Sequence, residues 1–291
     1  MSPVLRVSKL AHNASLAAHK NNPQKKPSVA RPAAFLSPPL RYFFAASAPK
    51  RRPKCRSKRR LDFAAGNGFP RRLLFFPMTS AKPPHPLDEL AKLRLLPILT
   101  VENPAHIAPL AQALIAGGLP CAEVTLRTTA ALEALKALAA RGDILAGAGT
   151  IRTVAQAKAA VLAGARFLVS PACVPDVLAW CRDNAVPITP GCVTPSEVEL
   201  ALSYGVKAVK FFPASNFGGA ATLKAYAGPL PDVKFIPTGG ISLKTLPEYL
   251  ALKNVLAVGG GWFASKDDLA AGRFPEIEQR VRDAVIIAKQ L

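Results

Sequence analysis

Two charged side chains lie inside apolar runs of the sequence, where charged groups are uncommon. Lys210 lies in VKAVKFFP (206–213), and Glu123 lies in LPCAEVTL (119–126). Apolar surroundings disfavour the ammonium form of a lysine, and the neutral amine is the form that attacks a carbonyl carbon. We therefore predict that Lys210 is a Schiff-base nucleophile and that Glu123 is its companion, able to move protons.

Both side chains also have structural interpretations. Lys210 could be satisfied by a carboxylate or could reach solvent at the rim of the fold, and Glu123 could form a salt bridge with Lys210 or Arg127. Alternate residues of a strand point to opposite faces. Glu123 therefore shares a face with Thr125 and Arg127, and Lys210 shares a face with Ala208. We expect these two faces to point to the interior of the fold.

Residues suited to a metal centre are scarce near the predicted strand ends. Three of the four histidines lie in or near the N-terminal segment, and His106 lies on a predicted helix. Only Glu102 and Glu123 fall near the end of a strand, which is too few for a cage of carboxylates and histidines. The sequence therefore disfavours metal-assisted chemistry, and we expect no cofactor.

Two glycine-rich segments follow predicted strands, PTGGIS (237–242) and VGGGW (258–262). Glycine lets the backbone approach a ligand closely, and backbone N–H groups at the start of a following helix favour an anion. In barrels of parallel strands, the loops after strands seven and eight frequently bind phosphate. The sequence therefore favours a phosphate site at these two segments.

Short apolar runs alternate with Ala- and Leu-rich stretches every 20 to 25 residues or so, which is typical of repeated βα units. We predict strands at 95–101, 119–126, 144–150, 166–170, 186–191, 206–213, 233–239 and 254–260. The predicted fold is α/β, a (β/α)8 TIM barrel with a short N-terminal helix. The alternative is an open doubly wound sheet, which would carry a Gly-rich fingerprint after its first strand.

Two of the predicted helices have recognisable ends. Gly117 and Gly118 are expected to stop the helix at 104–118, and Ser242 is expected to cap the helix at 242–253. If the fold is a barrel, the chemistry belongs at the carboxyl ends of the strands, where the βα loops converge.

Charge divides the chain into two parts. Residues 1–77 hold 17 of the 38 Lys and Arg residues and one of the 18 acidic residues, Asp62, so they carry +16 of the net charge of +20. This basic, Pro-rich leader buries too little apolar surface to offset the entropy of ordering it. We expect it to be disordered or only locally structured, and we expect residues 78–291 to form the folded domain.

Three interpretations of the leader remain open: an organellar transit peptide, a nucleic-acid-binding tail, and upstream sequence joined through a start codon assigned too early. We favour the third, because Met78 opens a plausible enzyme start. No nucleic-acid partner is expected. No apolar run of the leader is long enough to cross a membrane. Five scattered cysteines argue against a disulfide framework and favour a cytoplasmic location, although targeting by the leader stays open.

Six motifs, in order along the chain, resemble those of the KDPG/KHG aldolase family. They are EVTLRT (123–128), GAGT (147–150), SPA (170–172), VKFFPA (209–214), PTGGI (237–241) and GGGW (259–262). The resemblance implies a barrel, usually a homotrimer, that cleaves 2-keto-3-deoxy-6-phosphogluconate to pyruvate and glyceraldehyde 3-phosphate without a metal. This is a step of the Entner–Doudoroff pathway, and 4-hydroxy-2-oxoglutarate is a further possible substrate.

The same resemblance implies a role for each matching residue. Lys210 would form the Schiff base, and Glu123 would move protons during carbinolamine formation and carbon–carbon cleavage. The substrate-binding residues would be Arg127 and Thr150 for the pyruvate carboxylate, Pro171 and Phe212 for the wall, Thr238 beside the substrate chain, and Gly239, Gly240, Gly260 and Gly261 for the phosphate.

The chain departs from the family pattern at two positions. Gly261 stands where many relatives carry Ser, which removes a hydroxyl from the phosphate loop, and Ala172 stands where Gly is commoner. Two alternatives to the main prediction remain, a non-catalytic barrel that binds sugar phosphates and an aldolase specific for the C4-epimeric phosphogalactonate. Isomerases and epimerases of similar fold would need a His or a carboxylate pair at the strand ends, and the absence of histidines from the predicted strand ends argues against them.

Overall fold

The computed structural model describes residues 84–291. The predictions made for the leader at 1–77 lie outside these described residues. Strands and helices alternate along the described part of the chain, as the predicted βα units require.

Every predicted strand run contains an observed strand. The strands are β1 (Leu95–Leu99), β2 (Cys121–Thr125), β3 (Leu145–Gly149), β4 (Phe167–Val169), β5 (Ile188–Thr189), β6 (Gly191–Cys192), β7 (Ala208–Phe211), β8 (Lys234–Pro237) and β9 (Val258–Gly260). The run at 186–191 yields two short strands instead of one. Pro190 separates them because proline has no N–H to give to a strand ladder.

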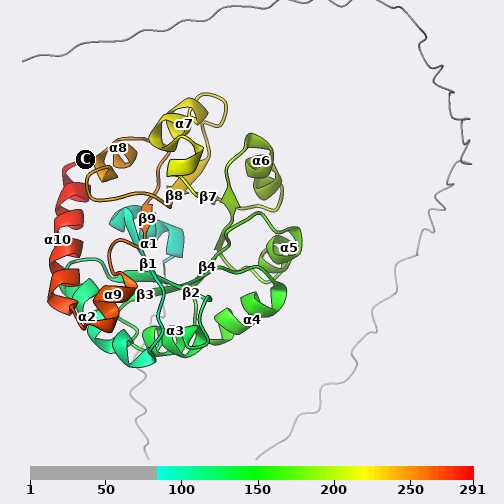
Figure 1. Cartoon of the computed structure of the whole chain (residues 1–291). Coiled ribbons are helices and arrows are strands. Elements are labelled where there is room, and N and C mark those ends of the chain that lie inside the picture. Colours follow the sequence, from blue (N-terminus) through cyan, green and yellow to red (C-terminus); the bar gives the residue numbers. More distant parts are fainter. Residues whose placement is uncertain (1–83) are drawn as a thin grey trace, which may run out of the picture. The chain divides into compact units, whose positions relative to one another are not determined.

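All observed strand pairs are parallel. One sheet has six strands in the order β5-β4-β3-β2-β1-β9, and a second sheet has three in the order β6-β7-β8. An isolated parallel bridge joins Thr238, which follows β8, to Gly259 of β9. The strands surround a common centre, with helices outside them (Figure 1). The predicted α/β class is confirmed, and the larger sheet forms a half-barrel.

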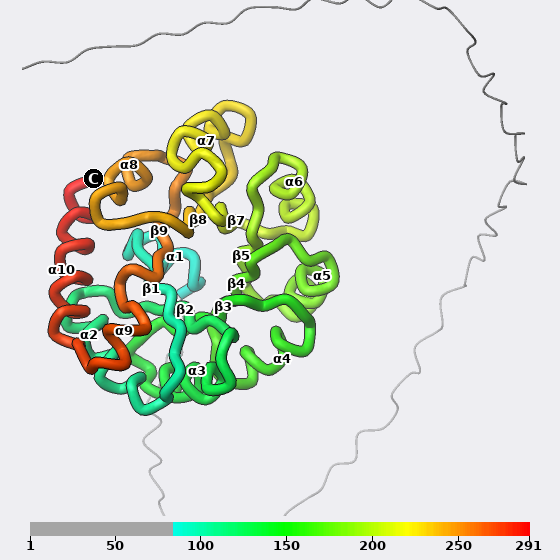
Figure 2. The backbone as a smooth tube through the Cα atoms, in the orientation of Figure 1, coloured from blue at the N-terminus to red at the C-terminus, as the bar shows by residue number. Residues whose placement is uncertain are grey.

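The helices are α1 (Pro86–Leu93), α2 (Ile107–Ala116), α3 (Ala131–Ala139), α4 (Val154–Leu162), α5 (Pro175–Asp183), α6 (Pro195–Ser203), α7 (Gly219–Tyr226), α8 (Leu246–Leu250), α9 (Lys266–Ala270) and α10 (Phe274–Gln290), with 3-10 turns η1 (Pro104–His106) and η2 (Ser215–Phe217). In Figure 2 most of the helices lie around the strands, whereas α1, in cyan, lies in the middle of the ring. The predicted short N-terminal helix is α1, whose first turn is capped by the His85 side chain.

The prediction that Ser242 caps a helix is wrong. Helix α8 begins at Leu246, and its N-cap residue is Thr245. The carbonyl of Ser242 instead accepts hydrogen bonds from the backbone N–H groups of Thr245 and Leu246, at 3.1 and 2.9 Å. Pro247 restricts the helix start, because a proline fits an α-helix only in its first turn.

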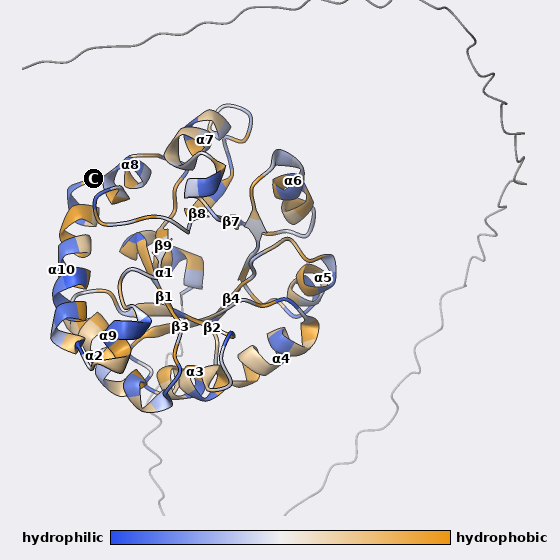
Figure 3. Ribbon diagram, in the orientation of Figure 1, coloured by the Kyte–Doolittle hydropathy of each residue, from blue (hydrophilic) through white to orange (hydrophobic). Residues whose placement is uncertain are grey.

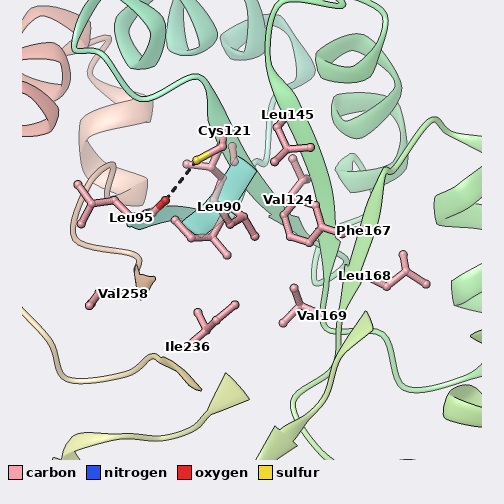
Figure 4. Packing of buried hydrophobic residues seen from close by; sticks show 14 of the residues in the cluster. Leu90, Leu95, Cys121, Val124, Leu145, Phe167, Leu168, Val169, Ile236 and Val258 are labelled. Carbon is pink, nitrogen blue, oxygen red and sulfur yellow. Dashed lines mark hydrogen bonds between the residues drawn. The ribbon is translucent and has the colours of Figure 1, made fainter. Parts of the chain in front are cut away.

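The core lies on both sides of the strands, between them and the helices and in the space that the strands surround. Figure 3 shows hydrophobic residues along the central strands, and both hydrophobic and hydrophilic residues on the surrounding helices. In Figure 4, Phe167, Val169 and Ile236 point to the centre, and the Cys121 thiol donates to the Leu95 carbonyl at 3.3 Å. At the end of α2, a Cβ on Gly117 would lie 2.5 Å from a methyl of Val281, so glycine is needed for α10 to pack there.

Candidate active site

A cavity of about 360 Å³ contains most of the predicted site residues. Nine of them line it: Glu123, Arg127, Thr150, Pro171, Lys210, Phe212, Thr238, Gly239 and Gly261. They come from the carboxyl-terminal parts of strands and from the loops that follow. The structure therefore brings together residues that are up to 138 positions apart in the sequence.

Lys210 and Glu123 meet inside this cavity from non-neighbouring strands, β7 and β2. The Lys210 Nζ lies 3.5 Å from Glu123 Oε1, and the two residues are 7% and 1% exposed. Among the described residues, neither Glu123 oxygen accepts a hydrogen bond. A carboxylate engaged by a direct charge-assisted bond would be expected at about 2.7–2.9 Å from its donor. The pair is close enough to exchange a proton through a small movement, yet Glu123 keeps its acceptor capacity.

The Lys210 amine is enclosed on one side by an aromatic ring. Its Nζ lies 5.2 Å from the centre of the Phe212 ring. The backbone N–H of Lys210 donates to the Pro190 carbonyl at 2.8 Å, which fixes this part of β7 beside β6. Lys207, three residues earlier, is exposed. Strand parity thus separates a buried lysine from an exposed one within the same run.

Gly149 provides the space that the Glu123 carboxylate occupies. A Cβ at this position would lie 1.9 Å from Glu123 Oε1, closer than two atoms can approach. The register of β2 against β3 places Thr125 beside Gly149. This register brings Gly149 next to the part of β2 that carries Glu123. Sequence reasoning identified the GAGT motif but gave Gly149 no role. Only the cross-strand packing reveals that a small residue is required there.

Thr150 follows Gly149 with a φ of 63°, in the left-handed region that a β-branched residue rarely adopts. Such a backbone conformation costs on the order of 1–3 kcal/mol and persists where the surroundings enforce it. The strain directs a threonine side chain into the wall of the cavity. A residue that lines a site while held in a costly conformation is a candidate for a functional role.

Arg127 lies at the exposed margin of the cavity. Its Nη2 donates a hydrogen bond to the Thr100 hydroxyl at 3.1 Å. No salt bridge holds this guanidinium among residues 84–291. Most of its five N–H donors thus remain available to an anionic ligand.

The four predicted phosphate-binding glycines separate into two pairs. Gly239, with a φ of +97°, and Gly261 line the cavity, whereas Gly240 and Gly260 do not. A Cβ on Gly240 would meet the Ser215 hydroxyl, and a Cβ on Gly260 would meet the Trp262 indole nitrogen. At Gly261 the nearest atom to an added Cβ is 3.7 Å away, the Ile98 carbonyl oxygen, so this loop position has room for a side chain.

Three cavity or margin residues were not predicted. Ile98 and Thr125 line the cavity, and Thr100 bonds to Arg127 at its margin. Thr125 shares strand parity with Glu123, which is the signal that could have identified it. Ile98 and Thr100 are also two residues apart, so the same strand parity could have identified them as lying on one side of the chain.

The cysteines near the cavity are poor candidates for a nucleophile. Burial raises the pKa of the Cys173 thiol, and burial together with the neighbouring Cys173 raises the pKa of the Cys192 thiol further. The thiolate is the reactive form of cysteine, and a raised pKa depletes it. Lys210 is therefore the better-placed nucleophile of the site.

A larger cavity, of about 600 Å³, lies near Tyr204 and Lys207 and shares no lining residue with the first cavity. Arg182, one of its cationic residues, is already engaged: it lies 5.7 Å from the centre of the Tyr204 ring and 2.9 Å from Asp183. This cavity contains no buried pair of opposite charge like that of Lys210 and Glu123. We therefore regard the smaller cavity as the candidate active site.

No helix within residues 84–291 is long and apolar enough to cross a membrane. No group of three or more His, Cys, Asp and Glu side chains in the same range is arranged to hold a metal ion.

Comparisons with known proteins converge on one family. The model for "KDPG and KHG aldolase" matches residues 87–280. A 2-dehydro-3-deoxy-phosphogluconate aldolase of Treponema pallidum is 47% identical over 191 residues, which are 65% of this chain and 91% of the relative. A KHG/KDPG aldolase of Escherichia coli K12 is 42% identical over 196 residues, which are 67% of this chain and 92% of the relative.

Solved structures agree with the sequence comparisons. The KDPG aldolase of Legionella pneumophila has a TM-score of 0.67 and is 38% identical, covering 69% of this chain and 98% of its own. That crystal structure holds pyruvate as a covalent carbinolamine intermediate. The KDPG aldolase of Zymomonas mobilis ZM4, solved with 3-phosphoglycerate, has a TM-score of 0.65 and is 36% identical, covering 69% of this chain and 95% of its own.

Proposed function

The chain belongs to the KDPG and KHG aldolase family, and from this premise we propose that it is a class I aldolase acting through Lys210. The reaction is the cleavage of 2-dehydro-3-deoxy-6-phosphogluconate to pyruvate and glyceraldehyde 3-phosphate. One observation carries the proposal: inside a cavity, a buried lysine amine lies 3.5 Å from a carboxylate that accepts no hydrogen bond from the described residues.

Lys210 begins the reaction as a nucleophile. Its Nζ attacks the C2 ketone of the substrate to give a carbinolamine, and loss of water gives a protonated imine. Removal of the proton from the C4 hydroxyl then breaks the C3–C4 bond and releases the aldehyde. The electron pair of that bond moves into the imine and forms an enamine. Protonation at C3 and hydrolysis of the imine release pyruvate and restore the lysine.

Glu123 moves the protons of these steps. It is the one carboxylate within reach of the Lys210 amine among the described residues, and its oxygens have no competing donors there. A carboxylate positioned in this way contributes about 100- to 10,000-fold to proton-transfer steps. The contact with Gly149 restricts where the carboxylate can lie, and this keeps it directed at the cavity.

The remaining cavity residues bind the substrate. Arg127 and Thr150 hold the pyruvate carboxylate, since a guanidinium can donate two parallel bonds to one carboxylate. Pro171 and Phe212 form the wall beside the pyruvyl group, and Thr238 lies along the substrate chain.

The phosphate binds at the glycine loops that follow β8 and β9, with backbone N–H groups as donors. Gly239 and Gly261 face the cavity and would contact the phosphate directly. Gly240 and Gly260 form the supporting turns, since Gly240 has a φ of +71° and a Cβ on either glycine would collide with a neighbouring side chain.

Several wider properties belong to the same proposal. The two sheets are the parts of one closed (β/α)8 barrel, joined at Pro190 and at the bridge between Thr238 and Gly259. Residues 78–291 are the enzyme domain, the active protein is a cytoplasmic homotrimer, and the reaction serves the Entner–Doudoroff pathway in carbohydrate metabolism. Neither a metal nor a cofactor takes part.

The test is a cleavage assay on the full chain, with pyruvate release measured by coupled reduction. We expect turnover of 2-dehydro-3-deoxy-6-phosphogluconate at a rate that EDTA leaves unchanged, and slower turnover of the C4 epimer and of 4-hydroxy-2-oxoglutarate. Activity that EDTA removes and an added divalent metal restores would contradict the imine mechanism. Tight substrate binding without turnover would favour the non-catalytic barrel instead.

A further inference from the structure

Arg127 is exposed, but its guanidinium is attached to the fold at one point. Its Nη2 donates to the Thr100 Oγ1 at 3.1 Å, and this is the hydrogen bond that its side chain makes within residues 84–291. Thr100 follows β1 and is half-buried, whereas Arg127 follows β2. The position of the guanidinium at the cavity margin therefore depends on the Thr100 hydroxyl.

The Thr100 hydroxyl belongs to a chain of hydrogen bonds with a fixed direction. Thr125 Oγ1 donates its single proton to the Leu99 carbonyl at 2.8 Å. The contact of 3.1 Å between the hydroxyls of Thr100 and Thr125 must then have Thr100 as its donor, because each hydroxyl has one proton. Thr100 in turn uses its lone pair to accept from Arg127. The chain runs from Arg127 through Thr100 and Thr125 to Leu99.

The inner end of this chain is rigid. Thr125 is 2% exposed and Leu99 is fully buried, and both lie on paired strands of the six-stranded sheet. An unattached arginine side chain loses rotamer entropy when a ligand immobilises it. Because Thr100 attaches the Arg127 guanidinium to buried residues, part of this entropy is already lost in the free protein. Less entropy is therefore lost when the ligand binds.

We infer that Thr100 is a positioning residue for the substrate carboxylate, acting by holding the Arg127 guanidinium at the margin of the active site. Thr100 does not line the cavity, so its effect passes through Arg127. This inference rests on the proposed function, in which Arg127 binds the carboxylate of the 2-keto acid. The carboxylate is bound in the ground state and in the transition state alike, so the effect falls on KM more than on kcat.

The test compares KM and kcat for 2-dehydro-3-deoxy-6-phosphogluconate in the full-length wild type and in Thr100→Val and Thr100→Ser. Valine keeps the branched shape and removes the hydroxyl, and we expect KM to rise about tenfold, with kcat within about twofold of wild type. Serine keeps the hydroxyl and should restore KM to near the wild-type value. Thr100→Ala replaces Thr100→Val in the same comparison should the valine variant not fold.

Thr128→Val is the matched control. The Thr128 hydroxyl donates to the Val101 carbonyl at 2.6 Å, so it joins the same two segments without a hydrogen bond to the Arg127 guanidinium. We expect this variant to melt at a lower temperature and to keep the wild-type KM. A rise in KM equal to that of Thr100→Val would show that loosening the segments, and not the attachment of Arg127, causes the effect.

A double-mutant cycle with Arg127→Ala identifies the route of the effect. In the Arg127→Ala background, we expect Thr100→Val to leave KM unchanged, because no guanidinium remains to be positioned. An undiminished effect in that background, or a Thr100→Val variant with the wild-type KM, overturns the inference. A folded wild type that fails to cleave the substrate overturns the proposed function instead, and the two failures are therefore distinguishable.

Discussion

Glu123 and Asp268 are carboxylates of similar burial, 1% and 6% exposed, in surroundings that differ sharply. Asp268 accepts four hydrogen bonds: from Arg273 Nε at 2.9 Å, from Arg280 Nη1 at 2.9 Å, and from the backbone N–H and hydroxyl of Ser265 at 3.1 and 2.8 Å. Glu123 accepts none from the described residues.

The difference separates a structural charge from the one that we propose to be functional. Asp268 completes a capping box at the start of α9 and joins α9 to α10 through Arg280. Its carboxylate oxygens are therefore occupied by hydrogen bonds that stabilise the fold. Glu123 is buried next to Lys210 at a cost in desolvation that no hydrogen bond from the described residues offsets. Proteins retain such under-bonded polar groups chiefly where function needs them, at the expense of stability.

The largest expected effect comes from removing the Glu123 charge. Glu123→Gln keeps the size of the side chain, and kcat should fall about 100- to 10,000-fold because proton transfer is lost. The free energy of unfolding should not decrease, since a neutral amide is less costly to bury than an underpaired carboxylate. Steady-state kinetics and urea unfolding of the same preparation give both values. A variant that is strongly destabilised but fully active would reverse the roles assigned to the two carboxylates.

The next largest effect should come from substituting Gly149, which packs against the Glu123 carboxylate. In Gly149→Ala the new methyl would lie 1.9 Å from Glu123 Oε1, so the carboxylate must move. Displacement of a catalytic group by about 1 Å can lower kcat about 100-fold. Gly228→Ala is the control, because a Cβ there has its nearest neighbour at 3.9 Å, and it should keep the wild-type kcat. Equal kcat values for the two variants would contradict a fixed position of the carboxylate.

Asp268→Asn should show the opposite pattern, with loss of stability and retained activity. We expect the free energy of unfolding at pH 7 to fall by about 2 kcal/mol, as for the loss of hydrogen bonds to a charged group. Chemical denaturation followed by tryptophan fluorescence measures this change. A large loss of kcat in a folded Asp268→Asn variant would contradict the assignment of Asp268 as a structural carboxylate.

The Asp268 contribution also has a predictable pH dependence. Burial alone would raise the pKa of Asp268, but hydrogen bonds from Ser265, Arg280 and Arg273 outweigh it and hold the pKa well below its ordinary value. A depressed carboxyl pKa stabilises the fold above the unfolded-state pKa of about 4 and loses this contribution as pH falls towards the folded-state pKa. The stability difference between wild type and Asp268→Asn should therefore be full at pH 7 and smaller at pH 3. A constant difference would contradict this assignment.

The smallest expected effect comes from Gly261→Ser. The Cβ at this position has room, so the fold should keep its stability. A serine hydroxyl facing the cavity should add one hydrogen bond to the phosphate and lower KM about threefold. Comparison with the phosphate-free substrate 4-hydroxy-2-oxoglutarate is the control, since its KM should not change. An equal change for both substrates would place the phosphate elsewhere.

Much of the fold could be predicted because its pattern is local. Each apolar run between helical stretches contains a strand, and strand parity placed Lys210 and Glu123 on inward faces. The break of the fifth run at Pro190 and the late start of α8 were missed. Both features depend on which backbone groups can form hydrogen bonds next to a proline. Neighbouring segments supply the partners of those groups, and apolar periodicity does not reveal them.

The site was harder to predict where it depends on contacts across strands. The sequence does not show that Gly149 makes room for Glu123, because the two residues belong to different strands and meet only through their register. The φ of 63° at Thr150 and the bond from Arg127 to Thr100 are likewise products of packing. Gly240 and Gly260 belong to the predicted loops but do not line the cavity, since a glycine pattern shows that a turn forms and not which residue faces inward.

The most direct test of the central claim is the intact mass of the full chain after incubation with pyruvate and borohydride. Reduction of the imine should add one pyruvyl group to the wild type and to Lys207→Ala, whose lysine is exposed on the same strand run, and peptide mapping should place it on Lys210. Lys210→Ala, shown to be folded by circular dichroism, should gain no mass. An adduct on Lys210→Ala equal to that of the wild type, or none on the folded wild type, would contradict Schiff-base catalysis by Lys210.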